Sequence, residues 1–220
     1  MKQNTKNLKN LLFAAAASLG LTAFAVAQDP MKAPPNPAEP TNYGLLGSTY
    51  AGVAWNYYRL SDGPPSAARG LTADFNQPLA DDLDFGVGYD WLRTRAAGFS
   101  TSEEKLDLST TTYARTDWGK PFLTAGVDHA WRDGDFAGRS GSWGLEAETG
   151  IEFQAAPALA VGPLAGWERE TGFNRNILHY GARTTYRMSR EWSATTALQW
   201  LDEKRDTDRA EFTLGVNRHF

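Results

Sequence analysis

The feature that most constrains the fold of this chain is strict alternation between apolar residues and small or charged residues. From Leu83 to Trp91 every odd residue is apolar and every even residue is Gly or Asp. Successive side chains of a β-strand point to opposite faces of a sheet, so this period predicts a strand with one apolar and one polar face. Nine other segments repeat the pattern and none favours a helix; their apolar positions span residues 53–57, 71–75, 106–114, 123–131, 143–153, 159–167, 178–186, 192–200 and 212–220.

These ten segments predict an all-β domain, in which an antiparallel up-and-down sheet closes into a barrel. Two of them, at residues 68–77 and 158–168, alternate least clearly, so a barrel of eight strands is the alternative. Each strand is expected to contain about 10 residues, the length that crosses a bilayer at a tilt. The composition stays rich in Gly, Thr and aromatic residues over residues 42–220, which predicts a single barrel domain there.

The N-terminus has the three parts of a secretory signal peptide. Three lysines precede an apolar run at residues 11–27, which ends in the small-x-small sequence Ala-Val-Ala. We therefore expect residues 1–27 to be a signal peptide, with a retained membrane anchor as the alternative. Residues 28–41 follow with five prolines in fourteen positions, and they are expected to form an extended periplasmic tether.

The composition excludes several functional classes. The chain has no cysteine, which removes disulfides, thiol nucleophiles and cysteine-based metal centres. A mean hydropathy of −0.47 argues against a bundle of transmembrane helices. Without the three lysines of the signal peptide, 19 basic and 26 acidic residues give a formal charge of −7. An acidic chain repels phosphates, so no nucleic-acid partner is expected.

Alternation alone does not say which face of the barrel wall points inward. In a soluble barrel of the lipocalin type the apolar face is inside, whereas in an outer-membrane barrel it contacts lipid. The connections favour a membrane barrel because they are predicted to alternate between long loops and tight turns. The longer connections are expected at residues 61–67, 93–105, 132–141, 168–176 and 202–208, and the turns at 77–82, 117–121, 155–158 and 188–191.

All eight tryptophans fall at the ends of the predicted strands. Indole rings have an apolar body and a polar tip, so they collect where a membrane meets water. We therefore expect two girdles of membrane-interface residues, one at the end with the longer loops and one at the other end: Trp55, Trp91, Trp131, Trp143, Trp167 and Trp200, then Trp118 and Trp192. Tryptophans that simply cap the core of a soluble barrel are the alternative.

The polar face is then expected to line the lumen, with glycines between larger charged residues. The predicted pore-lining residues are Asp84, Asp90, Asp128, Glu146, Glu148, Glu152, Arg115, Arg183 and Arg187. Asp74, Asp107 and Glu211 raise the acids to nine, which cannot all pair with three arginines. Two functions fit this lining. The charges neutralise one another in a closed structural or surface-interaction barrel, or unpaired acids line a narrow, weakly cation-preferring pore, which the charge excess favours.

The last strand carries the clearest family signal. Phe212, Leu214, Val216 and the terminal Phe220 alternate with polar residues, and the chain ends on an aromatic carboxylate. This end resembles the terminal strand of small bacterial outer-membrane β-barrels of the OmpA-like and porin-like class. The resemblance implies recognition by the barrel-assembly machinery and residence in the outer membrane of a Gram-negative bacterium. Because ten is an even number, both termini are then expected on the periplasmic side.

Basic residues gather in the longer predicted connections, although the protein as a whole is acidic. They are Arg93, Arg95, Lys105, Arg132, Arg139, Arg169, Arg175, Lys204 and Arg205. The outer leaflet presents lipopolysaccharide phosphates, and guanidinium groups pair well with phosphate. Outer-membrane lipid and lipopolysaccharide are therefore the expected partners, with ordinary solvated loop charge as the alternative.

No catalytic residue, cofactor or metal is predicted, and a lipid-modifying or proteolytic outer-membrane enzyme is the less favoured alternative. Asp128, Glu168 and His179 are expected near one rim, but they lack the nucleophile and base spacing of outer-membrane proteases and lipid A deacylases. Asp133 and Asp135 flank a glycine, and we interpret them as a turn rather than a calcium loop.

Overall fold

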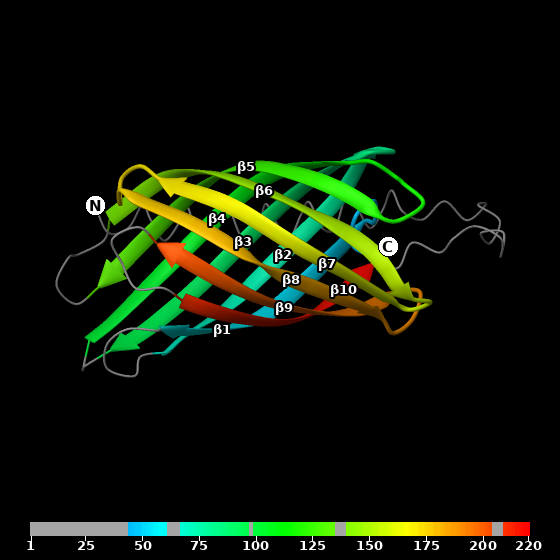
Figure 1. The fold of residues 1–220 in the computed structure, drawn as a ribbon. Helices are drawn as coiled ribbons and strands as arrows, with labels where there is room; N and C mark the ends of the chain where they lie inside the picture. The colour runs from blue at the N-terminus through cyan, green and yellow to red at the C-terminus, as the bar shows by residue number, and fades with distance from the viewer. Residues whose placement is uncertain (1–43, 61–66, 97–98, 135–139, 204–208) are drawn as a thin grey trace. The chain divides into compact units, whose positions relative to one another are not determined.

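The computed structural model describes residues 44–60, 67–96, 99–134, 140–203 and 209–220. These residues form ten strands: β1 (Tyr50–Leu60), β2 (Ala67–Ala80), β3 (Leu83–Ala96), β4 (Phe99–Tyr113), β5 (Lys120–Gly134), β6 (Ser140–Ala156), β7 (Leu159–Glu170), β8 (Arg175–Arg187), β9 (Trp192–Glu203) and β10 (Arg209–His219). Each strand pairs antiparallel with its neighbours in the chain, and β10 pairs with β1 to close the barrel (Figure 1). The prediction of a closed ten-strand barrel is confirmed. No helix in the described ranges is long and apolar enough to cross a membrane.

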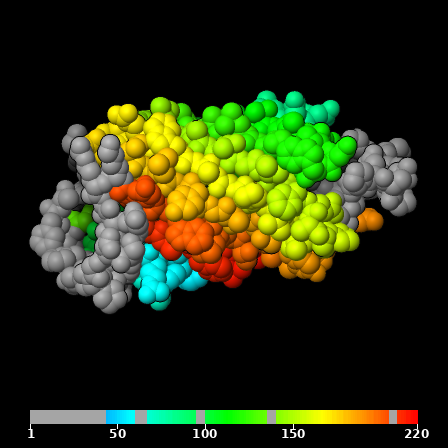
Figure 2. All heavy atoms as spheres, in the orientation of Figure 1, coloured from blue at the N-terminus to red at the C-terminus, as the bar shows by residue number. Residues whose placement is uncertain are grey.

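Most large apolar side chains of the strands point away from the barrel interior. Val53 of β1, Leu145 of β6 and Leu198 of β9 have exposed fractions of 64%, 53% and 44%. Figure 2 shows this outer wall on the side that runs from the yellow of β7 to the red of β10. Inward positions hold polar residues such as Asn56 and Ser193, which are buried. The prediction that the apolar face lies outside is therefore confirmed.

The strands are longer than expected, which corrects the predicted connections. They contain 11 to 17 residues rather than about 10, with the longest in β6. The connections after β1, β3, β5, β7 and β9 have 6, 2, 5, 4 and 5 residues, whereas those at the opposite end have 2, 6, 2 and 4. The expected contrast between long loops and tight turns is therefore weak. We call these the loop end and the turn end; Tyr50 and His219 pair at the turn end.

The strands are longer than predicted because apolar alternation marks only the positions that face away from water. The hydrogen-bonded ladder of a strand continues beyond those positions. Residues 93–105 were expected to be a long loop, yet Arg93 pairs with Ser102 and the ladder of β3 and β4 continues through them. Polar residues keep the backbone pairing of a strand even where neither face is apolar.

Glycines on the inward face make room for carboxylates inside the barrel. A Cβ on Gly144 would collide with the Asp128 carboxylate, and a Cβ on Gly126 would collide with the Glu146 carboxylate. Each glycine is the direct cross-strand partner of that acid. The acid side chain therefore extends across the space that the glycine leaves, as the sequence led us to expect.

A charge placed on the outer wall tests the lipid-facing assignment. Leu145→Arg should lower the free energy of unfolding in phospholipid vesicles by about 2–4 kcal/mol, because the guanidinium would face hydrocarbon. Met188 lies in the turn after β8 and is 51% exposed, so Met188→Arg serves as the matched control and should cost less than about 1 kcal/mol. Urea unfolding followed by tryptophan fluorescence measures both variants. Equal costs would contradict the assignment.

Candidate functional site

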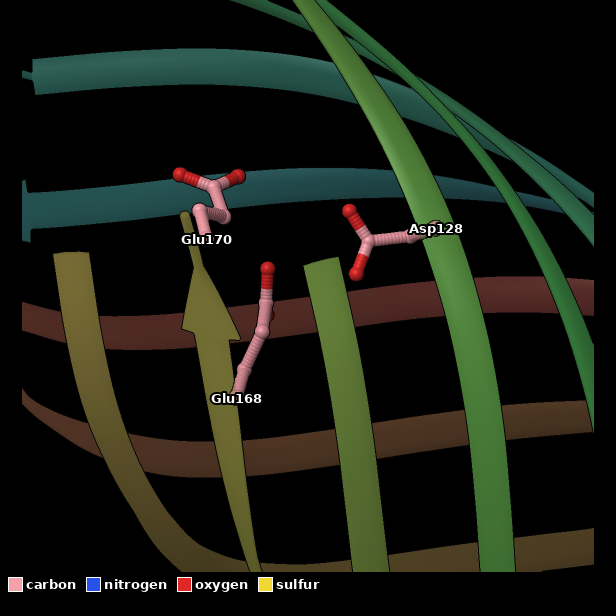
Figure 3. Close-up of side chains that lie close together, drawn as sticks. All are labelled: Asp128, Glu168 and Glu170. Atoms are coloured by element: carbon pink, nitrogen blue, oxygen red, sulfur yellow. The ribbon is translucent and has the colours of Figure 1, made fainter. Parts of the chain in front are cut away.

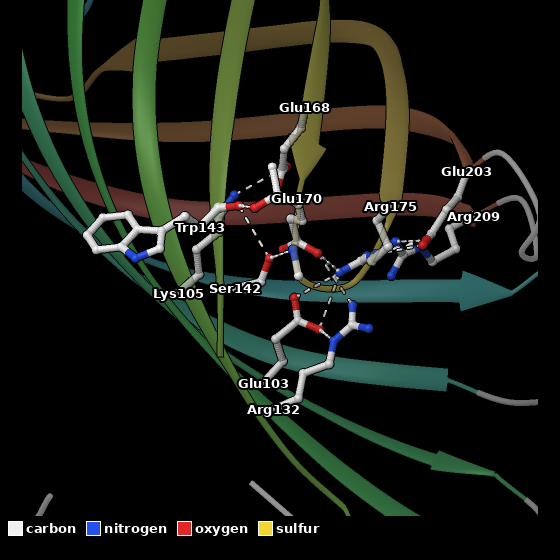
Figure 4. Close-up of polar contacts among 12 residues, drawn as sticks. Glu103, Lys105, Arg132, Ser142, Trp143, Glu168, Glu170, Arg175, Glu203 and Arg209 are labelled. Atoms are coloured by element: carbon white, nitrogen blue, oxygen red, sulfur yellow. Dashed lines mark hydrogen bonds and ion pairs between the residues drawn. The ribbon is translucent and has the colours of Figure 1, made fainter. Parts of the chain in front are cut away.

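Charged residues inside the barrel form a network at the loop end, centred on Arg175 at the start of β8 (Figure 4). The Arg175 guanidinium donates hydrogen bonds to Glu170 (3.0 Å), Glu203 (2.6 Å) and Glu103 (3.2 Å). Glu170 and Glu203 are almost fully buried, with exposed fractions of 1% and 4%. One cation therefore compensates carboxylates that come from β4, β7 and β9.

Two further arginines complete this loop-end ion network. Arg132 of β5 donates to Glu103 at 2.7 Å and lies 3.8 Å from Glu170. Arg209 of β10 donates to Glu203 at 2.7 Å. Members of the network thus come from β4, β5, β7, β8, β9 and β10 (Figure 4). A buried charge with several partners is far better compensated than one in an isolated pair.

Towards the middle of the barrel the lumen is mainly acidic. Lys105 of β4 forms an ion pair with Glu168 of β7 at 3.3 Å, and Asp90 of β3 accepts a hydrogen bond from Thr72. Asp128 of β5 is 1% exposed, and its carboxylate lies beside that of Glu168 (Figure 3). These side chains come from neighbouring strands around the barrel, so the acids converge on a shared space.

Residues 44–49, which directly precede β1, fold into the mouth of the barrel at the turn end. Four inward side chains hold the backbone of this 44–49 segment, two as acceptors and two as donors. The hydrogen bonds join Leu45 N to Glu152 (2.9 Å), Gly47 N to Asp84 (2.8 Å), Lys120 Nζ to Leu46 O (2.8 Å) and Asn76 Nδ2 to Ser48 O (2.8 Å). The Leu46 side chain packs with Tyr113, Phe122 and Leu164 in a buried apolar cluster. The segment is therefore anchored to the lumen wall by polar and apolar contacts.

A cavity of about 200 Å³ lies in the lumen next to the 44–49 segment, whose Leu45 and Leu46 form part of its wall. Glu148, which faces the cavity, lies 3.3 Å from His179. The charged lining residues are Asp74, Asp84, Asp107, Glu148 and Arg183. The cavity therefore keeps the excess of acid that the sequence predicted for the lumen.

Eight of the nine predicted pore-lining residues occupy inward strand positions. They are Asp84 and Asp90 on β3, Asp128 on β5, Glu146, Glu148 and Glu152 on β6, and Arg183 and Arg187 on β8. Arg187 is the last residue of β8 and donates to the Arg190 carbonyl at 2.5 Å, so it lies at the turn-end rim. Arg115 requires correction. It lies in the connection after β4, is exposed, and donates to the Asp81 carbonyl at 3.1 Å, because β4 ends before this residue. Whether the other eight line a conducting path stays a prediction.

The sequence reasoning missed several cations of the interior. They are Lys105, Lys120, Arg132, Arg175 and Arg209. All lie in or beside segments predicted as loops or turns, where apolar alternation fades. The sequence did contain a sign that Lys105 lies inside. Glu103, Lys105 and Asp107 are two residues apart, so they share the inward face of β4. The ion-pair partners of the missed cations include Glu103, Glu168, Glu170 and Glu203, which the count of nine acids also left out, so the acid excess of the interior persists.

Some of the basic residues that were expected to face lipopolysaccharide phosphates lie inside the barrel instead. Lys105, Arg132 and Arg175 are paired with carboxylates inside the barrel, so they do not face the outer leaflet. Arg93 and Arg169 are exposed near the loop end. The Arg95 side chain and residues Arg139, Lys204 and Arg205 lie outside the described residues.

The predicted interface tryptophans point mostly outward. Six have exposed fractions between 36% and 65%: Trp55, Trp91, Trp118, Trp143, Trp192 and Trp200. Trp131 is partly covered by His129, with ring centroids 4.5 Å apart, and the indole N–H of Trp167 donates to Asn176. Phe212, Leu214 and Val216 of β10 and the terminal Phe220 are also exposed, by 39% to 48%. Their contacts with lipid and with the assembly machinery stay predictions.

A serine and a histidine at the turn end form a pair that the sequence reasoning did not find. Ser193 Oγ lies 2.8 Å from His219 Nε2, and Asn217 donates to the same hydroxyl at 3.3 Å. The spacing is that of a nucleophile and a base. However, Ser193 has no exposed surface and His219 only 6%, so no substrate reaches the hydroxyl in this conformation. The pair ties β9 to β10, where the two strands end.

No protein-family model matches the sequence, and no curated protein matches it significantly. The similar solved structures include Neisserial surface protein A (16% identity, TM-score 0.44, 78% of this chain and 97% of that chain). The translocator domain of the autotransporter NalP from Neisseria meningitidis is 12% identical, with a TM-score of 0.48 over 94% of this chain and 97% of that chain. The N-terminal barrel of Pseudomonas aeruginosa OprF is 13% identical, with a TM-score of 0.36 over 79% and 98%. At these identities the similarity extends to the barrel architecture alone.

Removing the central cation tests the loop-end ion network. Arg175→Ala should lower the free energy of unfolding by about 3–5 kcal/mol, because three carboxylates lose their shared partner. Arg169→Ala, at an exposed position on β7, is the matched control and should change it by less than about 0.5 kcal/mol. Urea unfolding at neutral pH measures both. A small loss for Arg175→Ala would mean that the network adds little to stability.

Proposed function

We propose that the chain is an outer-membrane β-barrel protein with a lumen that is closed at rest, and that it acts as a structural or surface-interaction barrel. The observation that carries this proposal is the 44–49 segment, which four lumen side chains bind inside the turn-end mouth. A segment held by four hydrogen bonds and a buried leucine obstructs the path that a solute would take.

The division of side chains in the barrel wall supports the membrane location. Apolar side chains lie outside and ion pairs lie inside, which suits a wall surrounded by hydrocarbon. The predicted signal peptide at residues 1–27 and the resemblance of the last strand and Phe220 to the C-terminal ends of outer-membrane barrels support export and assembly in the outer membrane. In that location the turn end, where Tyr50 and His219 pair, faces the periplasm.

The loop-end ion network supports closure from the opposite side. A barrel of ten strands has an interior only slightly wider than its own side chains fill. Arg175 and its carboxylate partners reach into this space from several strands. Separating them to open a path would leave buried charges uncompensated, at a cost of several kcal/mol.

A narrow cation-preferring pore is the second candidate, and the charge of the cavity favours it. The cavity lining has four acids and one arginine, which would attract cations. In this case the 44–49 segment acts as a gate that leaves the mouth before ions pass.

Two chains that differ only in the 44–49 segment test the proposal. One begins at Gly44 and the other at Tyr50, so both lack the preceding residues. In planar bilayers in KCl, the chain from Gly44 should show no conductance above that of lipid alone. The chain from Tyr50 should show discrete steps, because the turn-end mouth is free. Leu46→Asn in the full mature chain is a smaller change that should also produce conductance steps.

The outcomes separate the two candidates. Steps of equal size from both truncated chains would contradict closure by the 44–49 segment. Conductance of the full mature chain, with a reversal potential in a KCl gradient that indicates cation preference, would favour the pore. The selectivity should then decrease in Glu148→Gln, which removes a charge from the cavity wall.

We also propose that Arg93 and Arg169 bind lipopolysaccharide phosphates, because both are exposed near the loop end. Replacing both with glutamine should lower the Tm by about 2–4 °C in vesicles that contain lipopolysaccharide and leave it unchanged in phospholipid vesicles. Arg190→Gln, at the turn end, is the control and should have no lipid-dependent effect. Equal Tm values for the double variant and the unsubstituted protein in lipopolysaccharide would refute the assignment.

A further inference from the structure

Three carboxylates converge in the lumen between its acidic middle and the loop-end ion network. One oxygen from each of Asp128, Glu168 and Glu170 lies within 4.8 Å of the other two (Figure 3). Asp128 projects from β5, and the two glutamates project from the end of β7. Asp128 and Glu170 each have an exposed fraction of 1%.

The Asp128 carboxylate has no hydrogen-bond partner among the described residues on either oxygen, and Oε1 of Glu170 has none either. Oxygens that are buried this deeply have no contact with bulk water. An ionised carboxylate in such a place is very costly unless a cation or donors compensate it. These three oxygens without partners, two on Asp128 and one on Glu170, therefore point to a positively charged ligand or to bound protons.

Acids on the adjacent strands add further negative charge around the three carboxylates. Asp107 stands directly opposite Asp128 in the pairing of β4 with β5, and Glu146 stands opposite Glu168 in the pairing of β6 with β7. Like charges in direct cross-strand pairs repel. Lys105 contacts Glu168 within this group, so one cation faces several acids. A single proton would leave most of this repulsion in place, whereas a divalent cation would remove it.

Neighbouring cations position the two glutamates and leave other oxygens available. Lys105 contacts Oε2 of Glu168, and Arg175 contacts Oε2 of Glu170. The Glu170 Oε1 atom is therefore free to act as a ligand while its partner oxygen is held. Ion-paired second oxygens of this kind orient carboxylate ligands in metal sites.

The separation of the oxygens fits a particular ion. When three oxygens all lie within 4.8 Å of one another, a point exists that is no more than about 2.8 Å from each of them. Ca²⁺ binds oxygen at about 2.3–2.6 Å in flexible geometry, so a small inward movement completes the contact. Mg²⁺ requires a shorter, near-octahedral arrangement and retains its water, and zinc prefers nitrogen and sulfur ligands.

We propose that Asp128, Glu168 and Glu170 form a calcium-binding site inside the barrel. Bound calcium joins β5 to β7 and lies against the loop-end ion network through Glu170, which belongs to both. This inference does not depend on whether the lumen conducts, because it concerns binding within the folded barrel.

Calorimetry with calcium chloride tests the site in the full mature chain, refolded in detergent micelles and freed of divalent ions with EDTA. We expect one calcium ion to bind per chain, and a higher Tm in calcium than in equal magnesium. Asp128→Asn should weaken calcium binding by about tenfold or more and abolish the rise in Tm. Asp74→Asn, at a lumen acid on β2 outside this group, is the matched control and should bind calcium as the unsubstituted protein does.

Asp128→Asn removes an uncompensated buried charge, so in calcium-free buffer it should be at least as stable as the unsubstituted protein. If it fails to fold, Glu168→Gln replaces it with the same expectation for calcium. Absence of binding by the unsubstituted protein at millimolar calcium, with an unchanged Tm, would overturn the proposal in favour of bound protons. Equal affinity in Asp128→Asn and the unsubstituted protein would overturn it as well. Neither readout measures conductance, so the outcome is independent of the proposed closure.

Discussion

The continuous ladder of hydrogen bonds between β1 and β10 is the interaction on which the rest of this barrel depends. It runs from Tyr50 opposite His219 to Leu60 opposite Arg209, so neither strand is left as an edge. In hydrocarbon an unpaired backbone group costs several kcal/mol, and only closure satisfies every strand. Closure also separates the side chains into an outer and an inner set. Because the outer set is apolar, almost all of the buried charge is confined to the interior.

Because the charged side chains are confined to the interior, they have to neutralise one another there. At the loop end this is achieved by sharing, since Arg175 contacts three carboxylates and Glu103 contacts two arginines. In the middle of the lumen cations become scarce and acids meet across neighbouring strands, as Asp107 and Asp128 do. The inner glycines allow this crowding, because each leaves space for an acid on the adjacent strand. A bound cation is the natural complement of such a region.

The two ends of the lumen are filled in different ways. Side chains of the strands themselves fill the loop end, whereas the backbone of the 44–49 segment fills the turn end. A backbone segment held by Glu152, Asp84, Lys120 and Asn76 can be released by breaking a few hydrogen bonds, each worth about 0.5–1.5 kcal/mol. A shared ion network is far harder to separate. If the barrel opens at all, the turn end is therefore the end at which opening costs less.

The sequence by itself determined the fold class and the face that carries the charge, and it favoured ten strands over eight, which the structure decided. An alternation such as that of residues 83–91 is a local property, and the requirement to keep apolar side chains from water turns it directly into a strand with two different faces. Strand lengths and ion pairs were decided by the tertiary structure. Lys105 and Glu168 are 63 residues apart in the chain, and Leu45 and Glu152 are 107 apart. Such partners meet only because the register and curvature of the closed sheet bring them together, and these are properties of the whole barrel rather than of any one segment.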